Sequence, residues 1–495
     1  MNLIRFAPAE GVRSMLEVSV GLLVLVVTLA VFVVVGLRAH RPGDDVEDYV
    51  IARNSQGTLT LGLSFLAAGT GAWILFAPPE VGAGVGLVGV LGYALGTAAP
   101  MIVFALIGRR MRAVVPAGHT LTEFVRLRFG RIVHAWVIGT SIAYMFLFVT
   151  AELTAAGAVG ATLAGIPAWV TILAVTVSTL AYTTVGGLRA SLRTDRFQAW
   201  LILGLLIACC AALTAALPAP GRAWSGSGLL GVDRGGLEVA VTLVIAVLAA
   251  NLLHQGYWQR VWAARDPMTL RRAAAVGSVT IVPVVFLVGA MGILAAGAGL
   301  DLGAPPAPVF ALLAGLPGWV VGGVLVLGVA LVASSVDTLQ IGLASLVVAE
   351  GRARTLGTAR ALTVALMVPA VAIALQGFSV LRLFLIADVL CAGVVVPALL
   401  GLWRRATPAG ALAGAAAGLV GAVLPGLVAT GSLAEGVLRA TFPGAVPTLP
   451  PFAGAVLASA AVAITVSLAG RRSTDLEEIG AQVRPLTPEP ALSTR

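Results

Sequence analysis

Long apolar stretches alternate with short polar connections along the whole chain. The apolar stretches lie at 15–37, 59–82, 86–108, 133–160, 168–187, 195–217, 237–257, 275–299, 318–346, 358–376, 378–402, 408–430 and 448–470. Because a helix needs about 20 apolar residues to cross a bilayer, this pattern predicts about 13 transmembrane helices. The connections are too short for a second folded domain, so residues 1–470 are expected to form a single transmembrane domain. The tail 471–495 is rich in Pro, Thr and Glu, which is typical of a disordered cytoplasmic end.

Two spans are interrupted by helix-breaking or polar residues. The span 59–82 carries Gly69, Thr70 and Gly71 at mid-depth, with two prolines further on. The span 237–257 runs into the sequence NLLHQGYWQR. Unwound backbone inside a membrane is tolerated only where it faces protein or a cavity, so both interruptions predict parts of a binding site. Close helix packing through glycines and an interfacial aromatic belt are the alternatives. The polar and aromatic candidates for solute binding around the second interruption are Asn251, His254, Gln255, Tyr257 and Trp258.

The basic residues predict how these spans are oriented. All 31 are arginines, and alternate connections hold 25 of them on one side and six on the other. Positively charged loops are retained in the cytoplasm, so the amino terminus is expected outside and the carboxyl terminus inside. Spans 59–82 and 237–257 then run in opposite directions and begin two blocks of five helices. This 5+5 inverted repeat over about 59–402 is the geometry of secondary transporters, with 15–37, 408–430 and 448–470 as extra helices.

Composition narrows the class of protein to a polytopic all-α membrane protein. Hydrophobic residues make up 59% of the chain, charged residues 11%, and the mean hydropathy is +1.01. The net charge of +9 comes from loop arginines rather than from a basic nucleic-acid surface. Three cysteines without metal-ligand spacing indicate no metal site, and no nucleophile-base pair supports an enzyme. We expect a small solute and the lipid bilayer as partners, without nucleic acid, an obligate protein partner or an organic cofactor. The bacterial cytoplasmic membrane is the expected location.

The span 318–346 contains hydroxyl side chains that could bind a cation. Ser334, Ser335 and Thr338 lie on one helical stripe with Leu331. Their hydroxyls, the Leu331 carbonyl and carbonyls freed at the break near Gly69 are hard oxygen ligands suited to an alkali cation. Alternatively, the serines hydrogen-bond to their own helix.

Acidic residues inside the spans are further candidates. A carboxylate facing lipid costs at least about 2–3 kcal/mol, so Glu152, Asp337 and Asp388 are expected to face the interior or a cavity. Each is a candidate for binding solute.

The chain also resembles the sodium:solute symporter family. The matching segments are DDVEDYVIARN with GLS at 44–64, GHTLTEFVRLRFG at 118–130, GGLRASLRTDRFQ at 186–198, QRVWAARDP at 259–267, ASSVDTLQ at 333–340 and VVVPALLGLWRRATPAGALAGAAAGLVG at 394–421. The resemblance covers about 44–425 in order. It implies the ten-helix core of the LeuT type, with one helix before it and two after.

The resemblance also implies a sodium site and a function. By position, the ion ligands are the carbonyls of Ala67, Thr70 and Leu331 and the hydroxyls of Ser334 and Ser335. Asp195 matches an aspartate linked to sodium in relatives. The implied function is sodium-driven uptake of a small polar organic solute by alternating access. A proton-coupled carrier of the same fold and a transporter-like solute sensor are the alternatives.

The implied solute stays open at this point. Proline carriers place an aspartate where alignment on Trp73, another solute-binding candidate, puts Gly69. Sugar carriers place an Asn-Gln pair where His254 and Gln255 stand. The string QGYWQR is similar to that of urea carriers.

Overall fold

The computed structural model of this protein is a bundle of long helices. It describes residues 15–40, 45–351, 355–443, 446–470, 473–483 and Leu486. The amino-terminal residues 1–14 and much of the tail therefore lie outside the described residues. Within the described part, 11 helices are long and apolar enough to cross a membrane, or up to 12 if one bent pair counts as a span.

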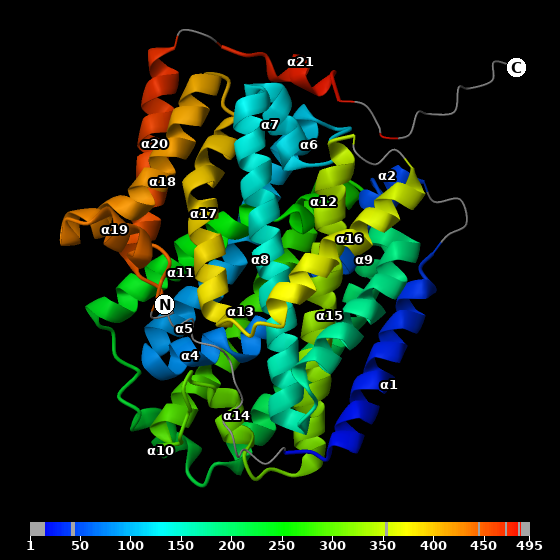
Figure 1. Cartoon of the computed structure of the whole chain (residues 1–495), viewed down its shortest axis with the longest axis vertical. Coiled ribbons are helices and arrows are strands. Elements are labelled where there is room, and N and C mark those ends of the chain that lie inside the picture. The colour runs from blue at the N-terminus through cyan, green and yellow to red at the C-terminus, as the bar shows by residue number, and fades with distance from the viewer. Residues whose placement is uncertain are drawn as a thin grey trace, which may run out of the picture.

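The helices follow the apolar pattern closely (Figure 1). The first half contains α1 Val18–Leu37, α2 Val46–Val50, α3 Thr58–Gly69, η1 Ala72–Leu75, α4 Ala77–Gly84, α5 Leu87–Val103, η2 Phe104–Gly108, α6 Arg109–Val114, α7 Leu121–Phe129, α8 Arg131–Ala164, α9 Ala168–Ala216 and α10 Pro220–Ser225. The second half contains α11 Arg234–Leu252, α12 Gln255–Ala263, α13 Pro267–Gly297, α14 Pro308–Leu313, α15 Gly318–Ala349, α16 Leu356–Ala374, α17 Val380–Leu400, α18 Pro408–Thr430, α19 Leu433–Arg439, α20 Leu449–Ala469 and α21 Leu476–Gly480.

Helix α9 contains a kink between two predicted spans. Gly187 inside it has φ 54° and ψ −143°, which is not helical. A side chain there would meet the Tyr49 carbonyl oxygen, 2.4 Å from an ideal Cβ. Glycine is required on both grounds, since only it adopts this backbone conformation readily. The predicted spans 168–187 and 195–217 are thus two segments meeting at a kink, and the total of 13 spans stays a prediction.

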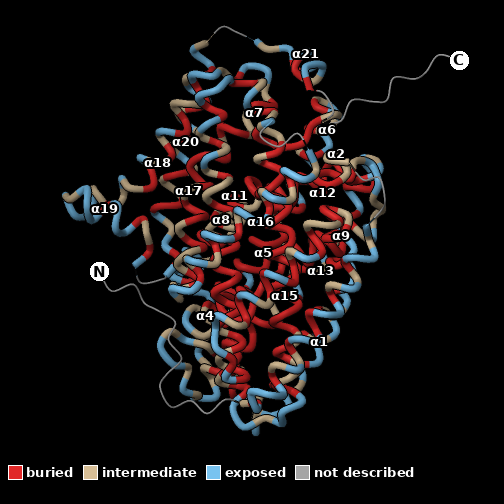
Figure 2. Tube along the Cα trace, turned by 45° about the vertical axis from the view of Figure 1, so that its right-hand side comes forward, coloured by how far each residue is buried: buried red, intermediate tan, exposed pale blue. Residues whose placement is uncertain are grey.

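Helix α15 lies at the centre of the bundle. In its most apolar stretch 78% of the residues are buried, against 22% for α16. It packs against α8, α9 and α1, and buried residues surround it in Figure 2. The predicted cation ligands on this helix are therefore enclosed by protein on all sides.

Helices α18 and α20 form a closely packed pair beside α17. An ideal Cβ on Gly414 would lie 2.5 Å from the Ala463 Cβ, and one on Gly421 would lie 2.2 Å from the Gly454 carbonyl oxygen. Small residues let membrane helices approach this closely. The pair corresponds to the two predicted extra helices after the core.

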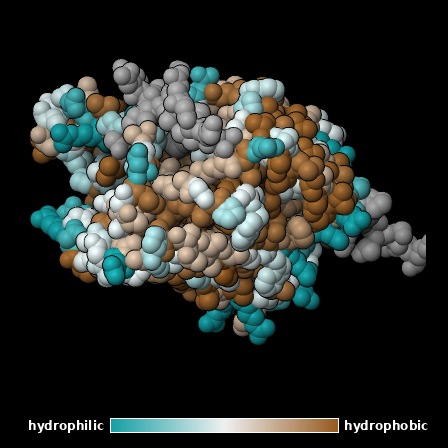
Figure 3. Space-filling model, turned by 90° about the horizontal axis from the view of Figure 1, so that it is seen from below, coloured by the Kyte–Doolittle hydropathy of each residue, from teal (hydrophilic) through white to brown (hydrophobic). Residues whose placement is uncertain are grey.

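The two ends of the bundle differ in character. The short helices α2, α6, α7 and α21 gather at the upper end in Figure 1, and α6 and α7 together carry five arginines, whereas α10 and α14 lie at the lower end. Figure 3 looks onto the lower end, where hydrophobic residues form much of the surface. The predicted orientation rests on the unequal number of arginines at the two ends, and it places the upper end in the cytoplasm.

Part of the carboxyl-terminal tail is folded against the upper end. Leu476 and Ile479 of α21 are buried, and the Thr474 amide donates to the Arg404 carbonyl at 3.0 Å. The Arg128 guanidinium in turn donates to the Thr474 hydroxyl at 2.9 Å. This packing of residues 473–483 differs from the disordered tail that composition predicts, because the short run LEEI buries two apolar side chains.

A charged cluster fixes the loops at this upper end. His119 places Nε2 2.8 Å from Glu47 and Nδ1 3.0 Å from Glu123, and Arg53 pairs with Glu47. Burial lowers the pKa of His119, but the two carboxylates outweigh it and raise the value to about 9. For Glu47 burial acts in the opposite direction and raises the pKa. The hydrogen bond and charge of His119 and the charge of Arg53 outweigh burial and bring the pKa of Glu47 down to about 2.

This cluster predicts a fall in stability at alkaline pH. The pKa of His119 is raised from 6.5 to about 9, so its stabilisation is complete below pH 6.5 and is lost as pH rises through 9. The shift corresponds to about 3 kcal/mol. The Glu47 contribution is present above pH 4.5 and disappears only as pH falls towards 2. Thermal melting in detergent between pH 6 and 9.5 should show this fall, and His119→Gln should flatten it. His40→Gln, at an exposed histidine, should leave the slope unchanged; a flat wild-type profile would contradict the assignment.

Candidate functional site

The span predicted to be broken is bent at the expected residues. Helix α3 ends at Gly69, Thr70 and Gly71 are extended, and η1 with α4 continues at an angle of 56°. Span 237–257 is also interrupted, with α11 ending at Leu252 and α12 starting at Gln255. Both breaks leave backbone groups without helical partners inside the bundle.

Three of the predicted sodium ligands, Ser334, Ala67 and Leu331, lie together at the first break. The Ser334 hydroxyl on α15 is 3.2 Å from the Ala67 carbonyl oxygen and 3.0 Å from that of Leu331. The Thr70 amide donates to the same Ala67 carbonyl at 3.2 Å. The Ser335 hydroxyl is buried and has no hydrogen-bond partner among the described residues. A buried hydroxyl without a partner is costly, and an ion at this point would satisfy it.

Glu152 stabilises the broken end of this helix. Its Oε2 accepts a hydrogen bond from the Ala72 amide at 2.8 Å, while Oε1 has no partner among the described residues. The carboxylate occupies the space where Gly71 would carry a side chain, since an ideal Cβ would lie 1.9 Å from Oε1. Glu152 therefore contacts the backbone of the break, and it does not line the central cavity described below.

The contact predicts that Gly71→Ala disrupts transport. The added methyl group would have to displace the Glu152 carboxylate, and we expect initial uptake to fall roughly tenfold, as for a buried clash of about 1–3 kcal/mol. Gly84→Ala, in the same bent span, is the matched control because its Cβ meets nothing within 4 Å. Shortening the acid in Gly71→Ala/Glu152→Asp should restore part of the uptake. Full activity of Gly71→Ala in proteoliposomes would show that this contact does not matter.

A small cavity of about 40 Å³ lies between the two broken helices. Its lining includes the predicted candidates Trp73, Asn251, Tyr257 and Asp388. It also includes residues that sequence reasoning missed: Tyr93, Thr97, Tyr144, Phe148 and Phe384. The volume is too small for an organic solute, so the site must widen before a solute binds.

Aromatic rings surround the carboxylate of Asp388 in this cavity. Trp73 stacks on Tyr93 with centroids 5.3 Å apart and meets Phe384 edge-on at 6.4 Å. Phe384, one turn before Asp388 on α17, packs on Phe148 at 4.9 Å. Asp388 makes no hydrogen bond or ion pair with any other residue that the structure describes, although it is largely buried. An unpaired carboxylate among aromatic faces is suited to a cationic or strongly hydrogen-bonding group.

Other predicted solute candidates lie outside this cavity. Gln255 donates to the His119 carbonyl at 2.8 Å, and the Trp258 indole donates to the Leu252 carbonyl at 2.8 Å. Asp337 accepts from Tyr182 and Ser191, each at 2.7 Å, and so joins α15 to α9. These three side chains hold elements together.

His254 lies just behind the aromatic rings of the cavity. Its Nδ1 accepts from the Gly256 amide at 3.0 Å, which leaves the proton on Nε2. That nitrogen is buried and has no partner among the described residues. The ring packs 5.0 Å from Tyr257 and 5.7 Å from Phe148.

Asp195, predicted to be linked to sodium, pairs with an arginine that sequence reasoning had treated as a loop residue. The Arg260 guanidinium lies 2.7 Å from Asp195 and 3.0 Å from the Thr338 hydroxyl, and both charged groups are fully buried. Ser64 on α3 donates to the same carboxylate. The pair thus connects α3, α9, α12 and α15, one helical turn from the serines of the cation site. The sequence holds one signal for this pairing: Arg260 comes only five residues after Gln255, where α12 begins, and so lies close to the break.

Two broken helices that face each other across a cavity with aromatic rings and one carboxylate are typical of a secondary transporter. Comparisons with known proteins agree. The sequence signature of the Sodium:solute symporter family matches residues 49–219. A spermidine transporter of Candida albicans, DUR31, is 30% identical over 362 residues, which are 72% of this chain and 70% of that protein. The urea-proton symporter DUR3 of Oryza sativa is 25% identical over 395 residues, 67% of this chain and 54% of that protein. The chain belongs to the sodium:solute symporter family.

A solved structure supports the fold independently. The outward-open state of a Na+-coupled sialic acid symporter superposes with a TM-score of 0.71 at 14% identity, covering 92% of this chain and 99% of that one. The superposition shows the all-helical LeuT-type fold, while the orientation predicted from the arginines stays a prediction. Membership in the family and the similarity to DUR31 make the chain a transporter and not an enzyme.

Proposed function

We propose that this protein couples inward sodium flow to uptake of a small nitrogen-containing solute, either a cationic amine or urea. The observation that carries the sodium part is the meeting of the Ser334 hydroxyl with the Ala67 and Leu331 carbonyls, beside the unpaired Ser335 hydroxyl. Together with Thr70 these residues supply about five oxygens, an ordinary shell for a hard monovalent cation. A sodium ion between α3 and α15 would hold the break in one geometry and so favour solute binding.

The solute part rests on the central cavity. Asp388 offers a carboxylate, Asn251 an amide, and Trp73, Tyr93 and Phe384 offer ring faces. A protonated amine satisfies the carboxylate directly, and the rings attract its charge. Urea would donate to the carboxylate and stack between rings. The relatives named for spermidine and urea transport agree with this range.

Proton coupling is the second candidate. It is favoured by the relative named as a urea-proton symporter and by the carboxylate of Asp388 in the cavity. In this mechanism the acid carries a proton where the first mechanism uses sodium at Ser334 and Ser335.

Uptake into proteoliposomes separates the two. Labelled spermidine and urea are offered under an inward sodium gradient without a pH gradient, and under an inward proton gradient without sodium; a sugar and a monocarboxylate serve as comparison solutes. Sodium-driven accumulation of an amine or urea supports the proposal. Accumulation driven only by protons would replace it with the second candidate, and accumulation of only the sugar or monocarboxylate would overturn the solute assignment.

The plasma membrane is the proposed location. Family membership supports a multi-pass membrane protein. The matched relatives come from a yeast and a plant, so they do not support the expected bacterial membrane.

A further inference from the structure

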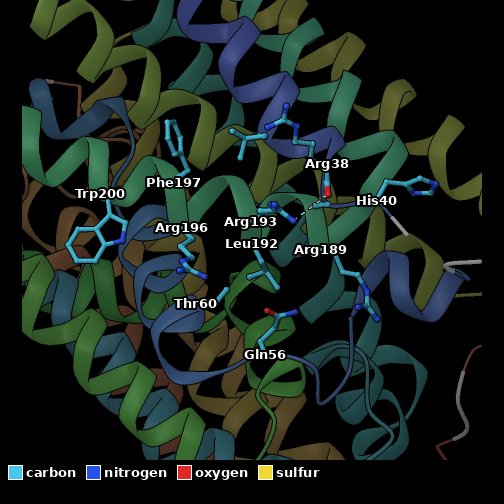
Figure 4. Close-up of a pocket in the computed structure, with 12 residues that line it drawn as sticks. Arg38, His40, Gln56, Thr60, Arg189, Leu192, Arg193, Arg196, Phe197 and Trp200 are labelled. Atoms are coloured by element: carbon cyan, nitrogen blue, oxygen red, sulfur yellow. Dashed lines mark hydrogen bonds between the residues drawn. The ribbon is translucent and has the colours of Figure 1, made fainter. Parts of the chain in front are cut away.

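A second pocket, of about 780 Å³, opens on the surface between the end of α1 and the second segment of α9 (Figure 4). Four of its 12 lining residues are arginines, and none of these 12 described residues is acidic. Arg38 comes from the end of α1, and Arg189, Arg193 and Arg196 come from α9. The pocket is far from neutral, and it is separate from the cavity around Asp388.

The arginines of α9 form one stripe with an aromatic residue. Arg189, Arg193, Arg196 and Trp200 follow at spacings of four, three and four, which places them on one helix face. Arg193 donates to the Arg38 carbonyl at 3.3 Å and so ties the two helices together. Arg189 pairs with Asp48. The side chains of Arg38, Arg193 and Arg196 are all exposed.

The same pocket has an aromatic floor formed by two exposed side chains. Phe197 is 41% exposed and Trp200 is 57% exposed, and both follow the arginines along α9. Aromatic residues concentrate where a membrane helix meets the interface. The arginines one to three turns away therefore lie at the depth of lipid headgroups, at the end of the bundle that carries most of the arginines.

We propose that this pocket binds the headgroup of an anionic phospholipid. The exposed guanidinium groups of Arg38, Arg193 and Arg196 line the pocket and would bind the phosphate, which arginine binds in a two-pronged geometry. The acyl chains run along Phe197 and Trp200. Basic pockets between helices on the cytoplasmic side have this role in membrane proteins. A free phosphate would use the same arginines but would leave the aromatic floor without a partner. The proposal does not depend on which solute the central cavity carries.

Binding of a short-chain lipid tests the proposal on the full-length protein in detergent. The probe is dihexanoyl-phosphatidylglycerol, titrated calorimetrically. The variant Arg38→Gln/Arg193→Gln/Arg196→Gln should bind it at least about tenfold more weakly than the wild type. The matched control Arg271→Gln/Arg272→Gln/Arg405→Gln removes the same charge at exposed positions elsewhere and should stay within about twofold of the wild type.

Two further measurements keep the test decisive. The single variant Arg196→Gln removes no hydrogen bond among the described residues, and it should still weaken binding about fivefold if the triple variant fails to fold. Inorganic phosphate should compete at least about tenfold less well than the lipid, because it lacks the apolar part. Equal weakening in the pocket and control variants, or equal competition by phosphate, would overturn the lipid site.

Discussion

Replacing Asp388 by Asn should reduce uptake of a cationic amine at least about a hundredfold. The substitution keeps the size of the side chain and removes the charge. Truncating one partner of a buried charge pair costs about 3–5 kcal/mol, and each 1.4 kcal/mol is a tenfold change. The effect should be so large because Asp388 is the one acidic residue among the described residues that line the cavity.

The same variant separates the two proposed solutes. Urea carries no charge, and the carbonyl oxygen of the new side-chain amide still accepts a hydrogen bond, so urea uptake should fall less than about tenfold. Initial rates of spermidine and urea uptake in proteoliposomes measure both. Glu238→Gln, at an exposed carboxylate, controls for the loss of a charge. Unchanged uptake of every solute in well-folded Asp388→Asn would remove the cavity from the transport pathway.

The fold could be predicted from the sequence because two strong signals agree. Apolar length locates most of the membrane helices, and the arginines predict opposed orientations for the spans holding Gly69 and His254, so a LeuT-type fold could be expected without tertiary information. The kink at Gly187 was less accessible. In the sequence a glycine in a polar connection indicates only a loop. Nothing in the local sequence distinguishes one kinked helix from two separate helices.

The residues of the proposed cation site stand out in the sequence, whereas those of the solute cavity do so only in part. Hydroxyls of Ser334 and Ser335 stand out in an apolar span, whereas Tyr93, Tyr144 and Phe384 look like ordinary packing or lipid-facing residues. Their role depends on which helices lie opposite them, and the spacing of residues along one helix does not tell which helices these are. Gln255 and Asp337 show the opposite case, in which a polar residue looks like a binding residue in the sequence but bonds to protein groups in the structure. Polar groups inside a membrane need partners, and here the partners are protein groups that join helices.

The positions of these groups suggest how the ion and the solute are coupled. Trp73 of the cavity and Thr70 of the cation site are three residues apart across the same break in α3 and η1. Glu152 fixes the backbone between them through the Ala72 amide. An ion that draws the Ala67 and Thr70 carbonyls towards α15 therefore also positions Trp73. This short segment therefore links the two proposed sites.

Changing Ser334 and Ser335 together to Ala should raise the sodium concentration for half-maximal uptake by at least about tenfold. The ion loses two of roughly five oxygens, and a bond to a charged group is worth about 1.5–3 kcal/mol. Ser345→Ala is the matched control, because it removes a buried hydroxyl from the same helix that bonds only to the Gly342 carbonyl at 2.9 Å. Solute uptake measured across a sodium series gives the half-maximal concentration for all three proteins. At saturating sodium the double variant should regain most of its uptake, since the cavity around Asp388 is intact. An unaltered sodium dependence in the double variant would place the coupling ion elsewhere, while a shift of equal size in Ser345→Ala would show that the effect comes from helix packing and not from ion ligands.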